Sequence, residues 1–163
     1  MAAPTEDTLT KISTDAATSF IQSFYSALKS DRASIAAFYS PVTSTILFNG
    51  NVVSDGAAVQ DIFVNQMPPT HYEVQSVDCQ IINQSFPTTT AAGVKPASQR
   101  SVKDMSLLVI VSGYVRFGES QDLPQRGFSE TFTLTPNPAA DQGPKGKGKR
   151  DWAIQSQNFR LVV

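Results

Sequence analysis

The sequence is poor in the residues that build covalent or metal-bound frameworks. Its 163 residues include a single cysteine, Cys79, and a single histidine, His71. One cysteine cannot form a disulfide within the chain, and a structural zinc site needs several cysteine or histidine ligands. We therefore expect a fold that is held together by its own hydrophobic core, with no cofactor and no metal.

Charge of one sign and long apolar runs are also scarce. Thirteen basic and fourteen acidic residues leave a formal net charge of −1. This balance does not select nucleic acid, a membrane or an acidic substrate as the partner of the whole molecule. The N-terminus lacks the order of a signal peptide, and no apolar run approaches the roughly 18 residues of a membrane span. We expect a soluble intracellular protein with one domain over residues 1–163.

Helical periodicity dominates the start of the chain. Apolar residues recur at steps of three and four from Leu9 to Leu28, which predicts a long amphipathic helix. A short second helix is expected in residues 32–40, before Pro41.

A hairpin and a third helix are expected next. Asn49-Gly50 lies between two apolar runs and predicts a tight β-hairpin, because both central residues of such a turn take positive φ. Asp55 is the expected N-cap of the third helix, and Pro68-Pro69 is expected to end it.

The rest of the chain has the pattern of strands separated by two irregular stretches. Strands are expected in residues 71–82, 106–117, 128–135 and 152–163. Residues 83–104 and 136–150 lack any period and are interpreted as long loops. Three helices followed by a mostly antiparallel sheet indicate the α+β class.

Two features predict that this sheet is strongly bent. Trp152 and Ile154 alternate in one phase, and the apolar residues from Phe159 onward alternate in the other. The change of phase indicates a β-bulge near Gln155–Gln157. Gly113 lies in the middle of another strand and favours a bend there. A sheet that is bent in this way can wrap around the long first helix.

The strand at residues 106–117 is apolar on both of its faces. The five successive apolar residues Leu107–Val111 cannot all face one helix, because side chains alternate across a strand. One face can cover the long helix, and the other needs a cover that this chain has no helix left to supply. The plain alternative is that Leu108, Ile110 and Tyr114 are half-exposed to solvent.

Five stretches, in this order, resemble the nuclear transport factor 2-like family: FNGNVVS, VDCQ, LLVIVSGYVRF, FSETFTL and AIQSQNFRLV. They are similar to the branch formed by the NTF2-related export proteins and the fungal mRNA transport regulators, and the long stretch at 83–104 is similar to the fungal version. The resemblance covers about residues 16–163 outside the two loops. It implies a cone-shaped fold in which three N-terminal helices pack on a strongly bent, mostly antiparallel sheet.

The resemblance implies a role without catalysis. The proteins of this branch are the small subunit of the mRNA export receptor, and they pair with the nuclear transport factor 2-like domain of the large subunit, sheet face against sheet face. The heterodimer contacts nucleoporins and carries mRNA, with pre-ribosomal particles as a further cargo. We therefore expect a protein that shuttles between nucleus, nuclear pore and cytoplasm.

The expected partner-binding residues lie on the outer side of the sheet. In this branch the last strand supplies an arginine that pairs with a carboxylate of the large subunit, and the matching residue here is Arg160. The expected set is Arg160, Leu108, Ile110, Tyr114, Thr133 and Val162. The apolar character of the last strand is attributed to the same contact. Alternation alone leaves open that Arg160 is a solvated arginine at a sheet edge.

The resemblance also implies a difference from nuclear transport factor 2 itself. That protein binds the GDP form of the Ran GTPase through an acid just before the glycine of the first hairpin. This chain has Asn49 at that position, so we expect no binding to Ran. Glu119 and Asp122 are interpreted as parts of a solvated turn.

The segment GPKGKGKR departs from the even balance of charge. Its bases are Lys145, Lys147, Lys149 and Arg150, with no acid among them. The alternation of bases with glycine predicts a flexible, positively charged arm. Two interpretations remain open, which are plain solubilisation and contact with the phosphates of exported RNA.

An enzyme with this fold would need an acid or a base inside the cone. The candidates are His71, Asp78, Tyr114 and Glu130. We interpret His71 as a rim residue, Asp78 as a structural hydrogen-bonding group and Glu130 as a strand-edge charge, although Glu130 has the parity of an inward residue. No catalytic residue is assigned. Two alternatives stay open: a homodimeric binding module, and a small-molecule isomerase or dehydratase that uses the cone pocket.

Overall fold

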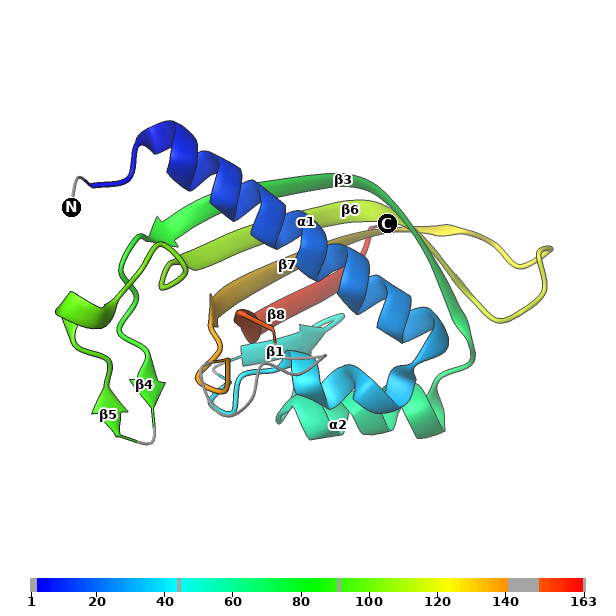
Figure 1. Cartoon of the computed structure of the whole chain (residues 1–163). Coiled ribbons are helices and arrows are strands. Elements are labelled where there is room, and N and C mark those ends of the chain that lie inside the picture. Colours follow the sequence, from blue (N-terminus) through cyan, green and yellow to red (C-terminus); the bar gives the residue numbers. More distant parts are fainter. Residues whose placement is uncertain (1–2, 44, 91, 141–149, 163) are drawn as a thin grey trace.

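A long helix crosses one side of a curved six-stranded sheet, and two shorter helical segments lie at one end of it (Figure 1). The computed structural model describes residues 3–43, 45–90, 92–140 and 150–162. The helical segments are α1 (Glu6–Ser30), the 3-10 helix η1 (Arg32–Phe38), α2 (Gly56–Asp61) and the π-helix η2 (Ile62–Gln66), which continues α2 directly. Helices precede most of the sheet in the chain, which confirms the predicted α+β class.

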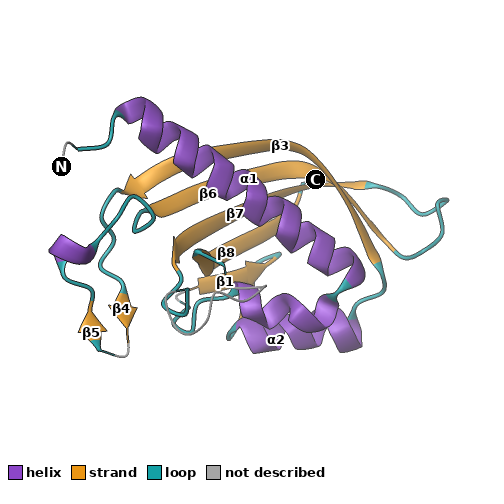
Figure 2. Cartoon of the chain, viewed as in Figure 1, coloured by secondary structure: helices purple, strands orange, loops and turns teal. Residues whose placement is uncertain are grey.

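The main sheet is open and strongly curved. Its strands are β1 (Thr45–Phe48), β2 (Asn51–Val53), β3 (Thr70–Asn83), β6 (Ser106–Phe117), β7 (Arg126–Pro136) and β8 (Trp152–Leu161). Their order is β2-β1-β8-β7-β6-β3, and all neighbours are antiparallel except β1 and β8, which are parallel. The sheet curves around α1 without closing into a barrel (Figure 2), which confirms the bent, mostly antiparallel sheet.

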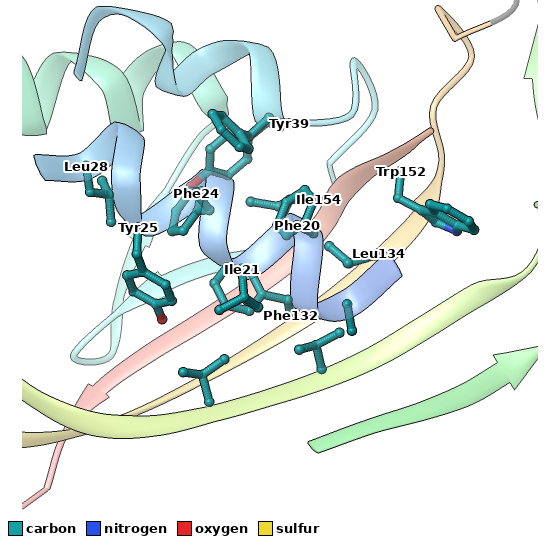
Figure 3. Packing of buried hydrophobic residues seen from close by; sticks show 14 of the residues in the cluster. Phe20, Ile21, Phe24, Tyr25, Leu28, Tyr39, Phe132, Leu134, Trp152 and Ile154 are labelled. Carbon is teal, nitrogen blue, oxygen red and sulfur yellow. The ribbon is translucent and has the colours of Figure 1, made fainter. Parts of the chain in front are cut away.

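Helix α1 buries the face that its apolar period predicts. It begins after Thr5, whose side-chain oxygen accepts a hydrogen bond from the N–H of Thr8 at 3.3 Å. Phe20 and Phe24 point from the helix toward the sheet, where the ring of Phe24 lies 5.3 Å from that of Phe132 (Figure 3). Aromatic side chains thus fill the space between α1 and the sheet, and α1 covers the inner side of the sheet.

An extra residue in β8 explains the change of phase in the last strand. The register with β7 shifts at this point and leaves Gln155 without a partner. The predicted bulge is therefore confirmed, and it returns Phe159 to the same buried side as Ile154. The apolar residues of β8 serve the core, so attributing them to a partner contact was wrong. Val162, which directly follows β8, lies on the other side of the sheet and is exposed.

Gly113 marks the bend of β6. A side chain at this position would overlap the carbonyl oxygen of Glu73 in the neighbouring strand. The register of β3 shifts between Val74 and Ser76, directly opposite Gly113. The two backbones approach each other closely here, which only a residue without a side chain allows.

The predicted hairpin turn is also confirmed, and it is tied to β8. Asn49 and Gly50 have φ values of 50° and 83°. The N–H of Asn49 donates to the carbonyl of Phe159 at 2.9 Å, and the side-chain oxygen of Asn49 accepts from the N–H of Leu161 at 2.9 Å. These two bonds attach the turn between β1 and β2 to the end of β8.

The third helix begins as predicted and ends in an unusual way. Asp55 caps α2 by accepting a hydrogen bond from its first turn at 2.8 Å. The chain then widens into the π-helix η2 before the two prolines. The guanidinium of Arg32 donates to the carbonyls of Phe63, Met67 and Pro68 at 2.7, 3.0 and 2.7 Å. Arg32 thus satisfies the carbonyl groups that the end of a helix leaves without partners.

The segment at residues 83–104 is more ordered than the long loop that was expected. It contains a hairpin of β4 (Thr89–Thr90) and β5 (Gly93–Val94), followed by a 3-10 turn, η3 (Ala97–Gln99). The ammonium group of Lys95 lies 3.0 Å from a carboxylate oxygen of Asp104, which is buried. This ion pair closes the base of the hairpin. In the second expected loop, residues 136–150, the backbone and side-chain N–H groups of Asn137 donate hydrogen bonds to the carbonyls of Asp151 and Arg150. Residues 141–149 lie outside the described chain.

Across the described ranges, no helix combines the length and the apolar character that a membrane crossing requires.

Candidate partner-binding face

The side of the main sheet that faces away from α1 forms a broad surface, which we call the outer face. Its side chains follow the strand register in four rows: Gln80, Leu108, Thr133 and Ser156; Asp78, Ile110, Thr131 and Asn158; Ser76, Ser112, Ser129 and Arg160; Glu73, Tyr114, Gly127 and Val162. Residues that alternate with them, such as Val109 and Phe132, are fully buried against the helix. The helices gather on the opposite side of the sheet (Figure 2).

The centre of the outer face is apolar and open. Ile110 is 38% exposed and Tyr114 is 42% exposed, while Leu108 is half-buried between them and the sheet end. Thr133 and Val162 lie on the same side, so the structure brings together all six residues that the sequence nominates for partner binding. That they bind a partner stays a prediction. Strand β6 is indeed apolar on both faces, and α1 covers only one of them.

Arg160 projects from β8 into a shallow hollow of about 390 Å³ on the outer face. Ser129 and Thr131 of β7 and Asn158 of β8 line this hollow, and Val162 borders it. Arg160 is exposed and has no acidic partner among the described residues. A planar guanidinium among hydroxyl groups suits a carboxylate that arrives from outside, because the fork can donate two parallel hydrogen bonds.

The position of Arg160 is held from the hairpin. The hydrogen bonds of Asn49 fix the backbone on both sides of Arg160, at Phe159 and Leu161. Gly50 lies under the guanidinium, because a side chain on Gly50 would come within 4.0 Å of Nη1. The sequence predicted the turn but not its hydrogen bonds to β8, because a bond between residues more than one hundred positions apart leaves no local pattern.

Glu130 faces the inside of the cone, so its interpretation as a strand-edge charge was wrong. It is 2% exposed. The hydroxyl of Tyr25 donates to Oε1 at 2.6 Å, and Nε2 of Gln157 donates to Oε2 at 2.7 Å. Gln157 in turn accepts a hydrogen bond from the hydroxyl of Tyr39. Burial raises the pKa of Glu130 to about 7, and the two hydrogen bonds only partly oppose it.

An acid with a pKa near neutrality can in principle transfer protons, but its surroundings here are packed. Both oxygens of Glu130 are engaged, and the rings of Tyr25, Tyr72 and Phe128 lie beside it with centroids 5.1–6.1 Å apart. Burial and the charge of Glu130 also raise the pKa of Tyr25, so its hydroxyl stays protonated and continues to donate.

The other candidate acids and bases do not converge with Glu130. Tyr114 and Asp78 lie on the outer face, where Asp78 is exposed and has no hydrogen-bond partner among the described residues. The structural role expected for Asp78 is therefore wrong. His71 lies near the start of β3, with Nε2 3.7 Å from a carboxylate oxygen of Glu119. The structure gathers no catalytic constellation from these four residues.

Only one residue of the basic segment falls within the described chain. Lys145, Lys147 and Lys149 lie outside it. Arg150 packs its guanidinium over the ring of Phe38, with its carbon 3.5 Å from the ring centroid. Partial burial in this position lowers the pKa of Arg150. Arg150 is thus held against the body of the protein by a cation–π contact.

Comparison with known proteins agrees with this architecture. A family model described as the nuclear transport factor 2 (NTF2) domain matches residues 16–143. A chain in the solved structure of a Sac3N peptide bound to Mex67:Mtr2 has a TM-score of 0.75 and 22% sequence identity, over 92% of this chain and 99% of that chain. A chain in the Chaetomium thermophilum complex of the Mex67 NTF2-like domain with Mtr2 has a TM-score of 0.74 and 22% identity, over 92% and 98%.

A solved structure of Mtr2 is also similar, with a TM-score of 0.71 and 21% identity over 92% of this chain and 99% of that chain. No curated protein sequence matches the chain. At these identities the structural matches establish a shared fold, and the family match spans most of the sequence. The helices packed inside a bent sheet, the outer face left open and the family match lead to one conclusion: this chain belongs to the nuclear transport factor 2 (NTF2) domain family.

Proposed function

We propose that this chain is the non-catalytic small subunit of a heterodimeric mRNA export receptor. In this proposal its outer face binds the NTF2-like domain of a Mex67-type large subunit. The observation that carries the proposal is the outer face itself, which is apolar in its centre, bears an unpaired arginine and is left open by α1. Solved complexes of Mex67 with Mtr2 contain chains of the same fold, which supports this choice of partner.

The chemistry of the outer face suits a stable pairing of two sheets. Ile110 and Tyr114 offer apolar and aromatic contact area at the centre, where binding energy concentrates in protein interfaces. Threonine and serine side chains surround them and can pair with polar groups of a partner. A stable heterodimer would bury at least about 2,000 Å² of surface in total. An interface of that size would cover most of the four rows of side chains on the outer face.

The heterodimer would be the functional form. Through its large subunit and its joint surfaces it would contact nucleoporins and carry mRNA, with pre-ribosomal particles as a second cargo, while shuttling between nucleus and cytoplasm. The packed cone is consistent with a scaffold, because aromatic side chains occupy the space beside Glu130 where a substrate would have to bind.

The test is to mix the chain with the NTF2-like domain of the large subunit from the same species and to measure mass and affinity. We expect a one-to-one complex. In the variant Arg160→Glu, a like charge opposes the partner carboxylate, and the affinity should fall by roughly 30-fold or more, or about 2–5 kcal/mol. Lys11→Glu, on the exposed side of α1, makes the same change of charge and should bind normally.

Two results would contradict the proposal. A wild-type chain that stays monomeric in the presence of the large subunit has no role as its small subunit. A chain that forms only dimers of itself, unaffected by the large subunit, would favour the homodimeric binding module instead.

A further inference from the structure

The outer face carries opposite charges toward its two sides. Arg160 lies on β8, and Asp78 lies on β3, the edge strand on the other side of β6 and β7 (Figure 1). The strand register places them in adjacent rows. In both rows, the positions of β6 and β7 are uncharged: Ile110, Thr131, Ser112 and Ser129.

These two charges are too far apart to neutralise each other. Three steps between strands of about 4.8 Å separate β3 from β8, so roughly 14 Å of sheet lies between them. At that distance in water an ion pair contributes little, and salt screens most of it. Both side chains are exposed, and neither has an ion-pair partner among the described residues. Each charge is therefore available to a partner.

The other charges of this surface are arranged differently. Glu73 pairs in register with Tyr114, and the next row of the outer side pairs His71 with Arg116. Glu73 and Arg116 are thus diagonal neighbours of opposite sign, so the field of each partly offsets that of the other. Asp78 is the acid that is left without a neighbouring base on this face.

We propose that Asp78 is a specificity-determining residue of the outer face and that it binds a lysine or arginine of the large subunit. This inference rests on the proposed function, and it extends that function to a second border of the same surface. The partner it requires has a sheet face with an anion opposite β8 and a cation opposite β3. Arg160 alone would require only the anion.

Two opposite charges fix the orientation of the partner. The apolar centre attracts without direction, because hydrophobic contact depends on area rather than on geometry. A partner turned by half a revolution about the normal of the sheet would place its anion over Asp78 and its cation over Arg160. Juxtaposed like charges repel each other and are costly to desolvate, so only one orientation remains favourable.

A second copy of this chain is the main competing occupant. If a two-fold axis ran along the strands between β6 and β7, β8 of one copy would lie over β3 of the other, and Arg160 would approach Asp78. The two occupants respond oppositely to an exchange of the charges. The double variant Asp78→Arg/Arg160→Asp keeps both pairs of a homodimer but sets like charges at both borders of a heterodimer.

The experiment titrates the NTF2-like domain of the large subunit from the same species against the wild-type chain and its variants at two salt concentrations. We expect Asp78→Lys to weaken binding at least 10-fold at low salt, with a smaller loss at high salt. Asp78→Asn removes the attraction without adding repulsion, so it should weaken binding less. Asp7→Lys, on α1, is the matched control and should bind as the wild-type chain does.

The outcomes separate the two claims. If the wild-type chain binds and Asp78→Lys binds equally well, this inference is overturned while the proposed function stands. If the wild-type chain does not bind at all, the proposed function fails first. The double variant should bind the large subunit more weakly than either Asp78→Lys or Arg160→Glu does. A double variant that self-associates like the wild-type chain and also keeps the wild-type affinity for the large subunit would overturn the assignment of Asp78 to the large subunit.

Discussion

The carboxyl group of Glu130 is held inside the cone by two neutral donors, and burial raises its pKa from 4.5 to about 7. In the unfolded chain its pKa returns to the ordinary value. Between these two values the folded state binds the proton more tightly than the unfolded state. The stability from this group is complete below about pH 4.5 and is lost as the pH rises through 7.

The variant Glu130→Gln should remove this pH dependence. A pKa of about 7 in place of 4.5 means that the wild-type free energy of unfolding should fall by roughly 2–3 kcal/mol between pH 5 and pH 8 from this group. The variant cannot ionise and should show a flatter profile. Urea unfolding at several pH values measures both curves, and parallel curves for the two proteins would contradict the assignment.

The inward position of Glu130 shows the limit of sequence reasoning for single residues. Its parity with Phe128 and Phe132 already permitted an inward acid, but a carboxylate is usually found at the surface unless it is paired. The decisive partners are Tyr25 and Gln157, which are 105 and 27 positions away in the sequence. Without the fold, nothing brings these donors to the acid.

Among the elements, β6 depends most directly on one position. The variant Gly113→Ala places a methyl group onto the carbonyl oxygen of Glu73, so the two strands must separate. We expect a loss of about 3 kcal/mol or more in unfolding free energy, because backbone atoms cannot move aside as side chains do. Gly127→Ala is the matched control, since its new methyl group meets only Val162 at 3.5 Å. Equal melting temperatures for the two variants would show that the bend does not need a glycine.

The end of η2 depends on Arg32. The variant Arg32→Lys keeps the charge but loses the planar guanidinium, which reaches four carbonyl groups and the hydroxyl of Thr70. Several bonds from a charged donor are lost, so we expect destabilisation of about 2–4 kcal/mol. Chemical unfolding gives the value, with Arg126→Lys at an exposed position as the control. If Arg32→Lys lowers the free energy of unfolding no more than the control does, η2 is stable without the contacts of Arg32.

Elements with a local signal were predictable, and those held by distant contacts were not. The period of α1, the Asn49-Gly50 turn and the cap at Asp55 each arise within a few residues, and the structure confirms all three. The strands of the hairpin inside residues 83–104 are too short to show an alternation of apolar and polar residues, and the ion pair at its base joins residues that lie outside these strands. The sequence therefore did not predict this hairpin. The π-helix likewise depends on Arg32, which lies 31 positions away from Phe63.

For the molecule as a whole, the even balance of charge makes the basic segment stand out. We expect Lys145, Lys147 and Lys149 to add weak contacts to RNA phosphates within the proposed heterodimer, whereas Arg150 is already held over the ring of Phe38. Each lost contact to a single strand should make the slope of log affinity against log salt shallower by about 0.7. Titration of RNA with the variant in which these three lysines are replaced by glutamine measures the change, and dimer formation should be unaffected. An identical slope would leave solubilisation as the role of these residues.

The outer face was only half predictable from the sequence. The apolar run of β6 predicted that one side of the sheet needs a cover, and the structure places Leu108, Ile110 and Tyr114 on that side. The role expected for Arg160 came from the family resemblance alone. Asp78 received another role because its relation to Arg160 exists only once four strands lie in order, and strand order is not encoded in any single strand.

The place of β8 in the sheet has a consequence for how the protein is made. β8 lies between β1 and β7, and it pairs in parallel with a strand that is synthesised more than one hundred residues earlier. While the ribosome is still adding these residues, the β1–β2 hairpin has no neighbour and the sheet has a gap in its middle. Contacts so distant in sequence form slowly, because the chain must first close a long loop. The domain therefore completes its sheet only after translation has passed Leu161, and until then β1 and β7 each lack the neighbour that lies between them in the folded sheet.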